Sequence, residues 1–389
     1  MRAALSECSG ASIADGGVDL LVDYSPCGAS VRDLLSMEWI AMKAAVLFKT
    51  GEPLRVIDNI DVPAPGRGQV LVKLAYSGVC HSQVMEASGA RGHDPYVPHL
   101  LGHEGSGTVI AVGDGVTKVA PGDRVVVGWI KGEGIDAAPP IYVHDGVLIN
   151  AGRVTTFNTQ ALVSENRCVR LPPGVPLDIA VLFGCAVPTG AGMALNDIDP
   201  QPDSQIAVFG LGGIGMIALL ALCAVGCKRV IAVDVSEAKL AAAREAGVAH
   251  TIDARTQDPV AAIRALTGGQ GVDYAIDAAG LTVTIEQAFQ SVRKFGGVCV
   301  FASHPRHGER ISIDPHDLIS GKQIRGSWGG SSRPDIDVPR FAALYGEGRL
   351  PLQKMIDKRY GLDEINCAID DLAAGKVMRP LIVLDPTQS

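Results

Sequence analysis

The most informative stretch of the chain is Gln205-Ile206-Ala207-Val208-Phe209-Gly210-Leu211-Gly212-Gly213-Ile214-Gly215. Its first five residues predict a buried strand, and an apolar helix is expected to begin near Met216. The glycines between them follow the pattern G-x-G-x-x-G. In this pattern Gly210 permits a tight turn, Gly212 lets the backbone approach a pyrophosphate, and Gly215 lets the helix pack closely. Backbone N–H groups at the helix start bind the anion, so Gly213 and Ile214 are also expected to line a dinucleotide site.

Asp234 stands at the end of the next expected strand, residues 229–233, nineteen residues beyond Gly215. At that place a carboxylate accepts hydrogen bonds from the adenosine ribose hydroxyls and repels a 2′-phosphate. The order of strand, glycines, helix, strand and acid therefore predicts binding of NAD in preference to NADP.

The rest of the chain divides into two kinds of pattern. From residue 205 to about 326, apolar strands alternate with helical segments such as 237–246, which ends before Gly247, and 283–294, which ends before Gly296-Gly297. This alternation is typical of a doubly wound parallel sheet. Between residues 43 and 170, short β-rich runs are separated by Gly and Pro and predict a mainly β domain. The fold class is therefore α/β, and two domains are expected for 389 residues.

The composition is that of a globular protein with small-molecule partners. The chain is 47% hydrophobic and carries a net charge of −8, which argues against a nucleic-acid-binding surface. Its nine cysteines are an odd number, spread widely, and are expected to be reduced cytoplasmic thiols. Residues 204–227 carry no charge and are long enough for a membrane span, but their five glycines favour a strand followed by a buried helix. We therefore expect a cytoplasmic protein with no membrane partner.

Residues 1–41 differ from the chain that follows them. They lack the positive start and continuous apolar segment of a secretory signal, and acidic Glu7, Asp15, Asp19 and Asp23 weigh against a transit peptide. At Met42 the pattern changes to an opening strand. Residues 1–41 are therefore interpreted as an N-terminal extension, either a loose native segment or an artefact of the assigned start.

Three further motifs contain residue types that bind zinc. They are Gly78-Val79-Cys80-His81-Ser82, Gly102-His103-Glu104-Gly105 and Gly184-Cys185-Ala186-Val187-Pro188-Thr189-Gly190. Together with the glycine motif, and in this order, they resemble the zinc-containing medium-chain alcohol dehydrogenases over about residues 43–386. The resemblance implies a mainly β, GroES-like catalytic domain at 42–188 and 327–389, and a Rossmann dinucleotide-binding domain at 189–326.

The resemblance also implies roles for the motif residues. Cys80, His103 and Cys185 match the three ligands of a catalytic zinc ion, and two thiolates with one imidazole suit this borderline-soft metal. Zinc would polarise an alcohol oxygen while NAD accepts a hydride, and the reverse reaction would reduce a carbonyl. Ser82 matches a hydroxyl that links the alcohol to a proton relay. Glu104 matches a carboxylate close to the metal.

Contacts to the coenzyme are implied as well, each with a simpler alternative. Thr189 matches a residue near nicotinamide, or else it is a capping or loop hydroxyl. His81 matches a cationic contact to pyrophosphate, or else it is merely exposed. Arg379 resembles a second pyrophosphate contact, from the C-terminal segment, or else it is solvated at the surface. Lys239 is placed among the coenzyme-binding residues on the same resemblance.

The chain departs from the family at the expected proton exit. The relay histidine that usually follows three residues after the hydroxyl is replaced by Met85. Glu86, His81, His93 and ordered water stay open as substitutes.

Two other departures concern the metal. Gln83 replaces an acid that commonly follows the hydroxyl, which changes the electrostatics around the ligands. Residues 126–167 contain no cysteine, whereas related enzymes often hold a structural zinc ion there with four. We therefore predict one zinc ion per chain.

The expected substrate is a small alcohol or its aldehyde or ketone. Trp129 and Phe157 align with pocket walls in the family, and core packing is the alternative for both. A sugar or polyol dehydrogenase of the same fold is an alternative function, and a non-catalytic NAD-binding protein is another. The resemblance makes a homodimer or homotetramer plausible, and the sequence offers no support for a nucleic-acid partner.

Overall fold

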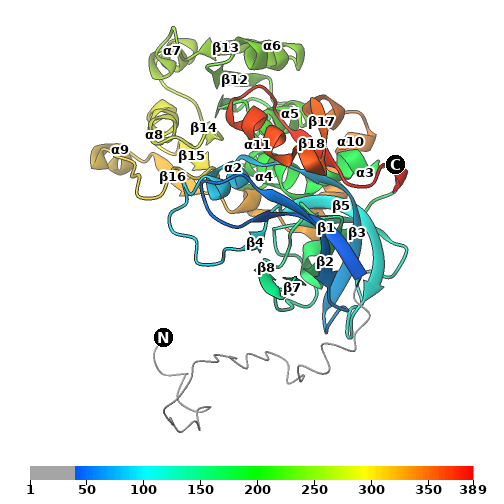
Figure 1. Ribbon diagram of the computed structural model, residues 1–389. Coiled ribbons are helices and arrows are strands. Elements are labelled where there is room, and N and C mark those ends of the chain that lie inside the picture. The colour runs from blue at the N-terminus through cyan, green and yellow to red at the C-terminus, as the bar shows by residue number, and fades with distance from the viewer. Residues whose placement is uncertain (1–39, 389) are drawn as a thin grey trace, which may run out of the picture. The chain divides into compact units, whose positions relative to one another are not determined.

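The computed structural model describes residues 40–388 (Figure 1). The expected N-terminal extension, residues 1–41, lies outside the described residues except for its last two members. Strand β1 (Ile40–Leu47) already includes them, because Ile40 and Ala41 pair with Val62 and Asp61 of β2 (Arg55–Val62). The folded body thus begins before Met42. Backbone pairing with β2 carries the strand past the point where the sequence pattern becomes regular.

The N-terminal lobe is mainly β-structure, as predicted. Five strands close into a barrel in the order β1-β2-β7-β8-β4, and a seven-stranded sheet runs β10-β6-β5-β3-β18-β17 with β9 also paired to β3. The remaining strands of this lobe are β3 (Gln69–Gly78), β4 (His99–Leu100), β5 (Glu104–Val112), β6 (Arg124–Gly128), β7 (Ile141–His144), β8 (Val147–Asn150), β9 (Gln160–Ser164), β10 (Cys168–Arg170), β17 (Lys358–Gly361) and β18 (Pro380–Val383).

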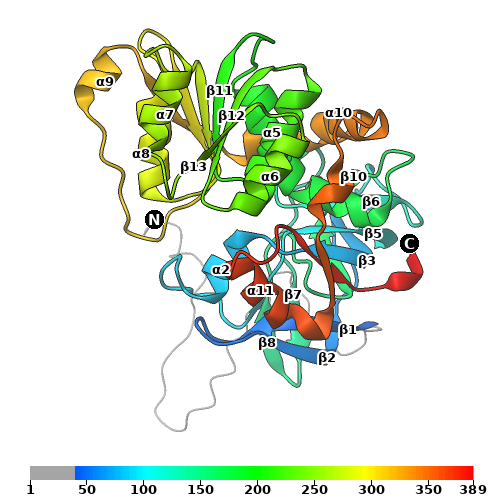
Figure 2. The same cartoon turned by 90° about the horizontal axis from the view of Figure 1, so that it is seen from above.

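The C-terminal segment returns to this lobe. Strand β18 pairs antiparallel with β3 and parallel with β17. Helix α11 (Ile365–Ala373) packs against α2 (His81–Ala87), and both views show the two helices side by side (Figures 1 and 2). The return brings residues near position 380 next to the segment that carries Cys80.

The second lobe is a six-stranded, fully parallel sheet, as predicted for a doubly wound fold. Its strand order is β13-β12-β11-β14-β15-β16. Because helices cover both faces, the central strands are continuous apolar runs rather than alternating ones. The strands are β11 (Gln205–Phe209), β12 (Arg229–Asp234), β13 (His250–Asp253), β14 (Tyr274–Asp277), β15 (Val298–Phe301) and β16 (Gln323–Gly326).

Alternate residues of one strand show how the two faces are covered. Ile206 and Val208 belong to the core cluster that includes α5 (Gly213–Ala224) and α6 (Glu237–Glu245). Ala207 and Phe209 belong to the cluster that includes α7 (Pro259–Leu266) and α8 (Thr282–Ser291). Figure 2 shows the two helix pairs on opposite sides of the sheet.

The last of these helices is shorter than the sequence pattern indicates. The pattern extends the helix to Lys294, but α8 ends at Ser291. Val292 is extended and forms a parallel bridge with Val272, so strand-like pairing replaces the last helical turn.

Further helices connect and flank the two lobes. The expected boundary between residues 188 and 189 falls inside α4. These helices are α3 (Leu177–Ala180), α4 (Ala186–Gly192), α9 (Pro315–Ile319) and α10 (Pro334–Gly346), with single turns η1 (Glu165–Arg167), η2 (Val181–Gly184), η3 (Met193–Asp197), η4 (Gly329–Ser331), η5 (Leu352–Met355), η6 (Leu362–Glu364) and η7 (Pro386–Gln388).

Within residues 40–388, no single helix is long and apolar enough to cross a membrane. One pair, Leu177–Gly184 with Ala186–Asp197, meets the length and composition criteria together, across a bend of 57°. Nearly all side chains of this pair are buried, many of them in the largest core cluster. The uncharged stretch 204–227 contains strand β11 and the 12-residue helix α5.

Candidate metal and coenzyme site

The structure brings Cys80, His103 and Cys185 together. One potential ligand atom from each lies within 4.8 Å of the other two, and His103 Nε2 is 3.2 Å from Cys185 Sγ. All three residues stand where an element begins. Cys80 precedes α2, His103 precedes β5, and Cys185 lies between η2 and α4. Two sulfurs and one imidazole nitrogen at this spacing fit the donor set of a zinc ion that keeps one position open for substrate.

Local backbone geometry places the imidazole. Gly102, the residue before His103, has φ of 89°, a conformation that strains any residue with a Cβ. A Cβ there would also lie 2.8 Å from the backbone nitrogen of Phe157. The Gln83 side chain then links two of the candidate ligands, because its Oε1 accepts from Cys80 N at 2.9 Å while its amide is hydrogen-bonded with His103 Nδ1. Gln83 therefore orients the ring.

The two thiols share a buried electrostatic environment. A hydrogen bond with Cys185, followed by the influence of His103 and Arg379, lowers the pKa of Cys80 against the cost of burial. The same hydrogen bond, together with burial, raises the pKa of Cys185. The site therefore favours a thiolate at Cys80, which is the form that binds a metal.

Glu104 is fully buried beside the candidate ligands and pairs with Arg379. Arg379 Nη2 donates to Glu104 Oε2 at 2.9 Å, while Glu104 Oε1 is buried and has no partner within residues 40–388. Desolvation raises the pKa of Glu104, and the charge of Arg379 opposes that rise. Burial acts against the charge of Arg379, but attraction by Glu104 and the two thiols raises its pKa overall.

The glycine loop lies next to the same arginine. Gly210 has φ of 81°, and Gly212 faces open space, since a Cβ there would meet nothing within 4 Å. A Cβ on Gly213 would lie 2.3 Å from Cδ of Arg379. Arg379 is therefore neither solvated at the surface nor free. It lies between the glycine loop and Glu104, so the surface alternative for this residue is wrong.

Asp234 ends β12 beside the glycine loop. Its Oδ2 accepts from Leu211 N at 2.6 Å and its Oδ1 accepts from Ser236 N at 2.8 Å. The carboxylate is thus fixed next to the loop in the place expected of a ribose-binding acid. Ile214 and Lys239 are both half-buried, on α5 and α6 respectively.

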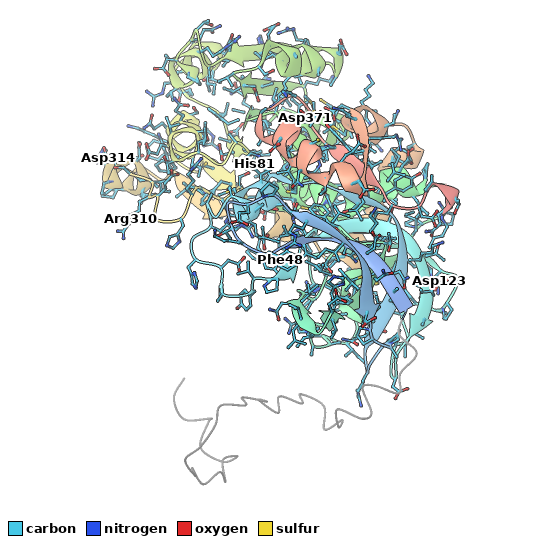
Figure 3. All side chains as sticks on the ribbon, in the orientation of Figure 1. Phe48, His81, Asp123, Arg310, Asp314 and Asp371 are labelled. Atoms are coloured by element: carbon cyan, nitrogen blue, oxygen red, sulfur yellow. The ribbon has the colours of Figure 1, made fainter. Side chains whose placement is uncertain are left out.

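Two buried hydroxyls near the candidate ligands have no hydrogen-bond partner among the residues that the structure describes. They are Ser82 Oγ on α2 and Thr189 Oγ1 on α4. A capping hydroxyl would be bonded to the backbone, so the open Thr189 hydroxyl supports a ligand contact instead. His81, labelled in Figure 3, is exposed at the start of α2.

The two expected pocket residues lie in different environments. Phe157 is fully buried in a core cluster with Leu47 and Val79, which is the packing alternative. Trp129 is half-buried, and its ring meets His103 edge-on at 6.4 Å between centroids. The sequence reasoning did not identify Trp328, whose ring lies 5.0 Å from that of Trp129. Trp328 belongs to no sequence motif. Its contact with Trp129 joins residues far apart in the sequence and is visible only in the folded structure.

A second group of ligand-type side chains, Glu86, Asp94 and His99, also lies within 4.8 Å. Both nitrogens of His99 already have partners, Leu100 O at 2.9 Å and Asp94 Oδ2 at 2.8 Å. These bonds tie the segment after α2 to β4, so we interpret the group as structural.

Comparisons with known proteins agree with this architecture. Residues 66–173 match the alcohol dehydrogenase GroES-like domain, and residues 213–344 match the zinc-binding dehydrogenase domain. Geraniol dehydrogenase of Castellaniella defragrans is 32% identical over 376 residues, which cover 90% of this chain and 99% of the relative.

Solved structures of similar proteins share the fold. An alcohol dehydrogenase zinc-binding domain protein from Burkholderia ambifaria gives a TM-score of 0.83 at 30% identity, covering 90% of this chain and 100% of the other. Benzyl alcohol dehydrogenase from Acinetobacter calcoaceticus gives 0.80 at 29%, covering 89% and 100%.

A GroES-like lobe joined to a Rossmann-type lobe defines the class of medium-chain dehydrogenases and reductases. Within that class, the chain belongs to the zinc-containing alcohol dehydrogenase family. It is therefore an oxidoreductase of alcohols.

Proposed function

We propose that this chain uses zinc and NAD(H) to interconvert an alcohol with its aldehyde or ketone. The observation that carries the proposal is the approach of Cys80, His103 and Cys185 to within 4.8 Å, from three separate parts of the sequence. When bound, zinc polarises the substrate oxygen and NAD accepts the hydride.

The chain's own residues prepare the site for this reaction. Cys80, His103 and Cys185 would hold the metal, and Gln83 keeps the His103 ring in one orientation. The buried Ser82 Oγ, which has no partner among residues 40–388, is available to accept a hydrogen bond from the alcohol and to take its proton while passing its own hydroxyl proton onward. Proton exit beyond this atom differs from the family pattern, because Met85 cannot carry a proton.

Binding of the coenzyme is assigned to the glycine loop and Asp234. Gly212 leaves space for a pyrophosphate, and Asp234 is held by two backbone N–H groups where a ribose would lie. A 2′-phosphate next to this carboxylate would be repelled, so we expect NAD to be preferred to NADP.

A substrate screen tests the proposal. Purified protein is assayed by NADH absorbance with ethanol, geraniol, benzyl alcohol, a secondary alcohol and a sugar alcohol, and in reverse with the matching carbonyls. The assay is repeated after chelation and after zinc is restored. We expect turnover that chelation abolishes and zinc recovers. Exclusive oxidation of the sugar alcohol would favour the polyol alternative. Binding of NADH by metal-loaded protein, without turnover of any compound, would favour the non-catalytic one.

A further inference from the structure

We propose that Trp129 and Trp328 form an aromatic wall that selects alcohols with an aromatic ring or conjugated double bond next to the carbinol carbon. The inference rests on the proposed function and narrows its substrate class. It concerns two side chains, only one of which the sequence motifs had indicated.

The wall begins at a candidate metal ligand. The ring of Trp129 meets the ring of His103 at 6.4 Å and 71°, and the ring of Trp328 meets that of Trp129 at 5.0 Å and 82°. Both geometries are edge-to-face arrangements, which aromatic rings favour. The three rings therefore form a row that starts at the candidate metal ligand His103, continues through Trp129 and ends at Trp328.

The solvent exposure of the three rings increases from His103 to Trp328. His103 and Trp129 are half-buried, whereas Trp328 is 71% exposed. Other large apolar side chains, such as Phe295 and Ile319, are at least as exposed, but Trp328 is in ring contact with Trp129, which itself meets a candidate metal ligand. Because Trp328 contacts Trp129, and Trp129 contacts His103, the substrate's own side chain is the occupant to which we commit.

The backbone that follows Trp328 is tied to α4. Ser332 Oγ donates to Pro188 O at 2.8 Å, and a Cβ on Gly330 would lie 2.3 Å from that same oxygen. A Cβ on Gly329, the residue after Trp328, would lie 2.7 Å from the Ile130 side chain. Trp328 is thus held in place beside the helix that begins after Cys185.

A ring or planar double bond gains from this wall in a way that a saturated group does not. Aromatic pairs in good geometry contribute beyond simple area burial, by an amount equal to about two- to tenfold in an equilibrium constant for each contact. The indole faces offer little to the hydroxyls of a polyol. The expected order of preference is therefore aromatic or conjugated alcohol, then saturated alcohol of equal size, then polyol.

Matched substrates test the wall directly. Benzyl alcohol and cyclohexylmethanol have rings of equal carbon number, and only the first is aromatic. We expect kcat/KM to favour benzyl alcohol by about tenfold or more in the wild type. Trp328→Leu keeps the apolar bulk but removes one of the two ring contacts, so it should lower the ratio by about two- to tenfold, while Trp328→Phe should keep most of it. An unchanged ratio in Trp328→Leu would overturn the proposal.

A second measurement does not depend on turnover. The chain contains only three tryptophans, so in Trp39→Phe all tryptophan emission comes from Trp129 and Trp328. Benzyl alcohol should change this emission at lower concentration than cyclohexylmethanol, and Trp328→Leu should reduce the difference. Equal titration curves for the two alcohols would contradict the wall. Failure to oxidise any alcohol, combined with a selective emission change, would contradict the proposed function but not the wall.

A second copy of this chain is the competing occupant of Trp328. Light scattering after size exclusion separates the two cases. If Trp328→Leu dissociates an oligomer and lowers kcat/KM equally for both alcohols, the exposed ring is an interface and the proposal is wrong. An unchanged assembly with a reduced aromatic preference supports it.

Discussion

Arg379 Nη2 lies 2.9 Å from Glu104 Oε2, and the two side chains are only 5% and 0% exposed. The pair joins the C-terminal segment to the first residue of β5, immediately after His103. It therefore ties together parts of the chain that are 275 residues apart. A charge pair removed so completely from water must stay paired.

Breaking this pair from one side should destabilise the protein. In Arg379→Met, Glu104 loses its compensating charge, and we expect the free energy of unfolding to fall by roughly 3–5 kcal/mol. Adding Glu104→Gln should recover part of that loss, since no uncompensated charge is then buried. Urea denaturation of the two single variants and the double variant measures the coupling. A loss below about 1 kcal/mol in Arg379→Met would show that the pair is not needed.

Two glycines of the G-x-G-x-x-G motif should respond differently to replacement by alanine. A Cβ on Gly215 would lie 1.8 Å from Gly210 O, so Gly215→Ala should lower stability by about 1–3 kcal/mol. Gly212→Ala meets no atom within 4 Å and should fold normally, but it should weaken NADH binding by about tenfold or more because the methyl group occupies the expected pyrophosphate position. Thermal unfolding and NADH fluorescence titration check both variants. Wild-type NADH affinity in Gly212→Ala would remove the loop from this role.

Metal analysis tests the ligand set. Cys185→Ser and Cys80→Ser each remove one thiolate, so the zinc content should fall from about one ion per chain to nearly none. Cys367→Ser is the matched control because Cys367 is exposed and lies on α11. Two tightly bound zinc ions per wild-type chain, or full occupancy in Cys185→Ser, would be incompatible with the prediction.

Coenzyme choice should depend on Asp234. Asp234→Ser removes the charge that repels a 2′-phosphate, and we expect the ratio of kcat/KM for NAD over NADP to fall by at least about tenfold. Asp253→Asn is a suitable control, since Asp253 is the registered neighbour on β13 and is paired with Arg255. Equal ratios in wild type and Asp234→Ser would assign the preference elsewhere.

The buried Asp277 predicts a pH-dependent stability. Desolvation raises its pKa from 3.8 to about 6, so its charged form opposes folding above that pH. Asp277→Asn should therefore stabilise the protein at pH 8 by up to about 3 kcal/mol. The gain should shrink as the pH falls from 6 towards 4, where the wild-type carboxyl is protonated in the folded state. Asp145→Asn, at a side chain that is 90% exposed, should show no such gain in urea denaturation.

Much of the architecture follows from local sequence. The alternation of apolar strands and helices from residue 205 to about 326 predicted the parallel sheet, and Gly210, Gly212 and Gly215 marked its first strand–turn–helix unit. The end of α8 was not predictable in this way. Val292 continues a good helical pattern, and only its bridge to Val272 takes it out of the helix.

The candidate site shows the same division. Cys80, His103 and Cys185 stand in short, recognisable motifs, and the structure brings them together. Trp328 and the pairing of Arg379 with Glu104 depend on where the chain returns after hundreds of residues. No local pattern encodes such contacts, so they become visible only in three dimensions.

The bond from Ser332 to Pro188 has an evolutionary consequence. The bond anchors the loop that carries Trp328 to α4, the helix that follows Cys185. Under the proposed role of Trp328, exchanging that one side chain would alter which alcohols fit without moving the candidate metal ligands. Point mutations at this position could therefore change the substrate preference of descendant proteins and leave the proposed reaction unchanged.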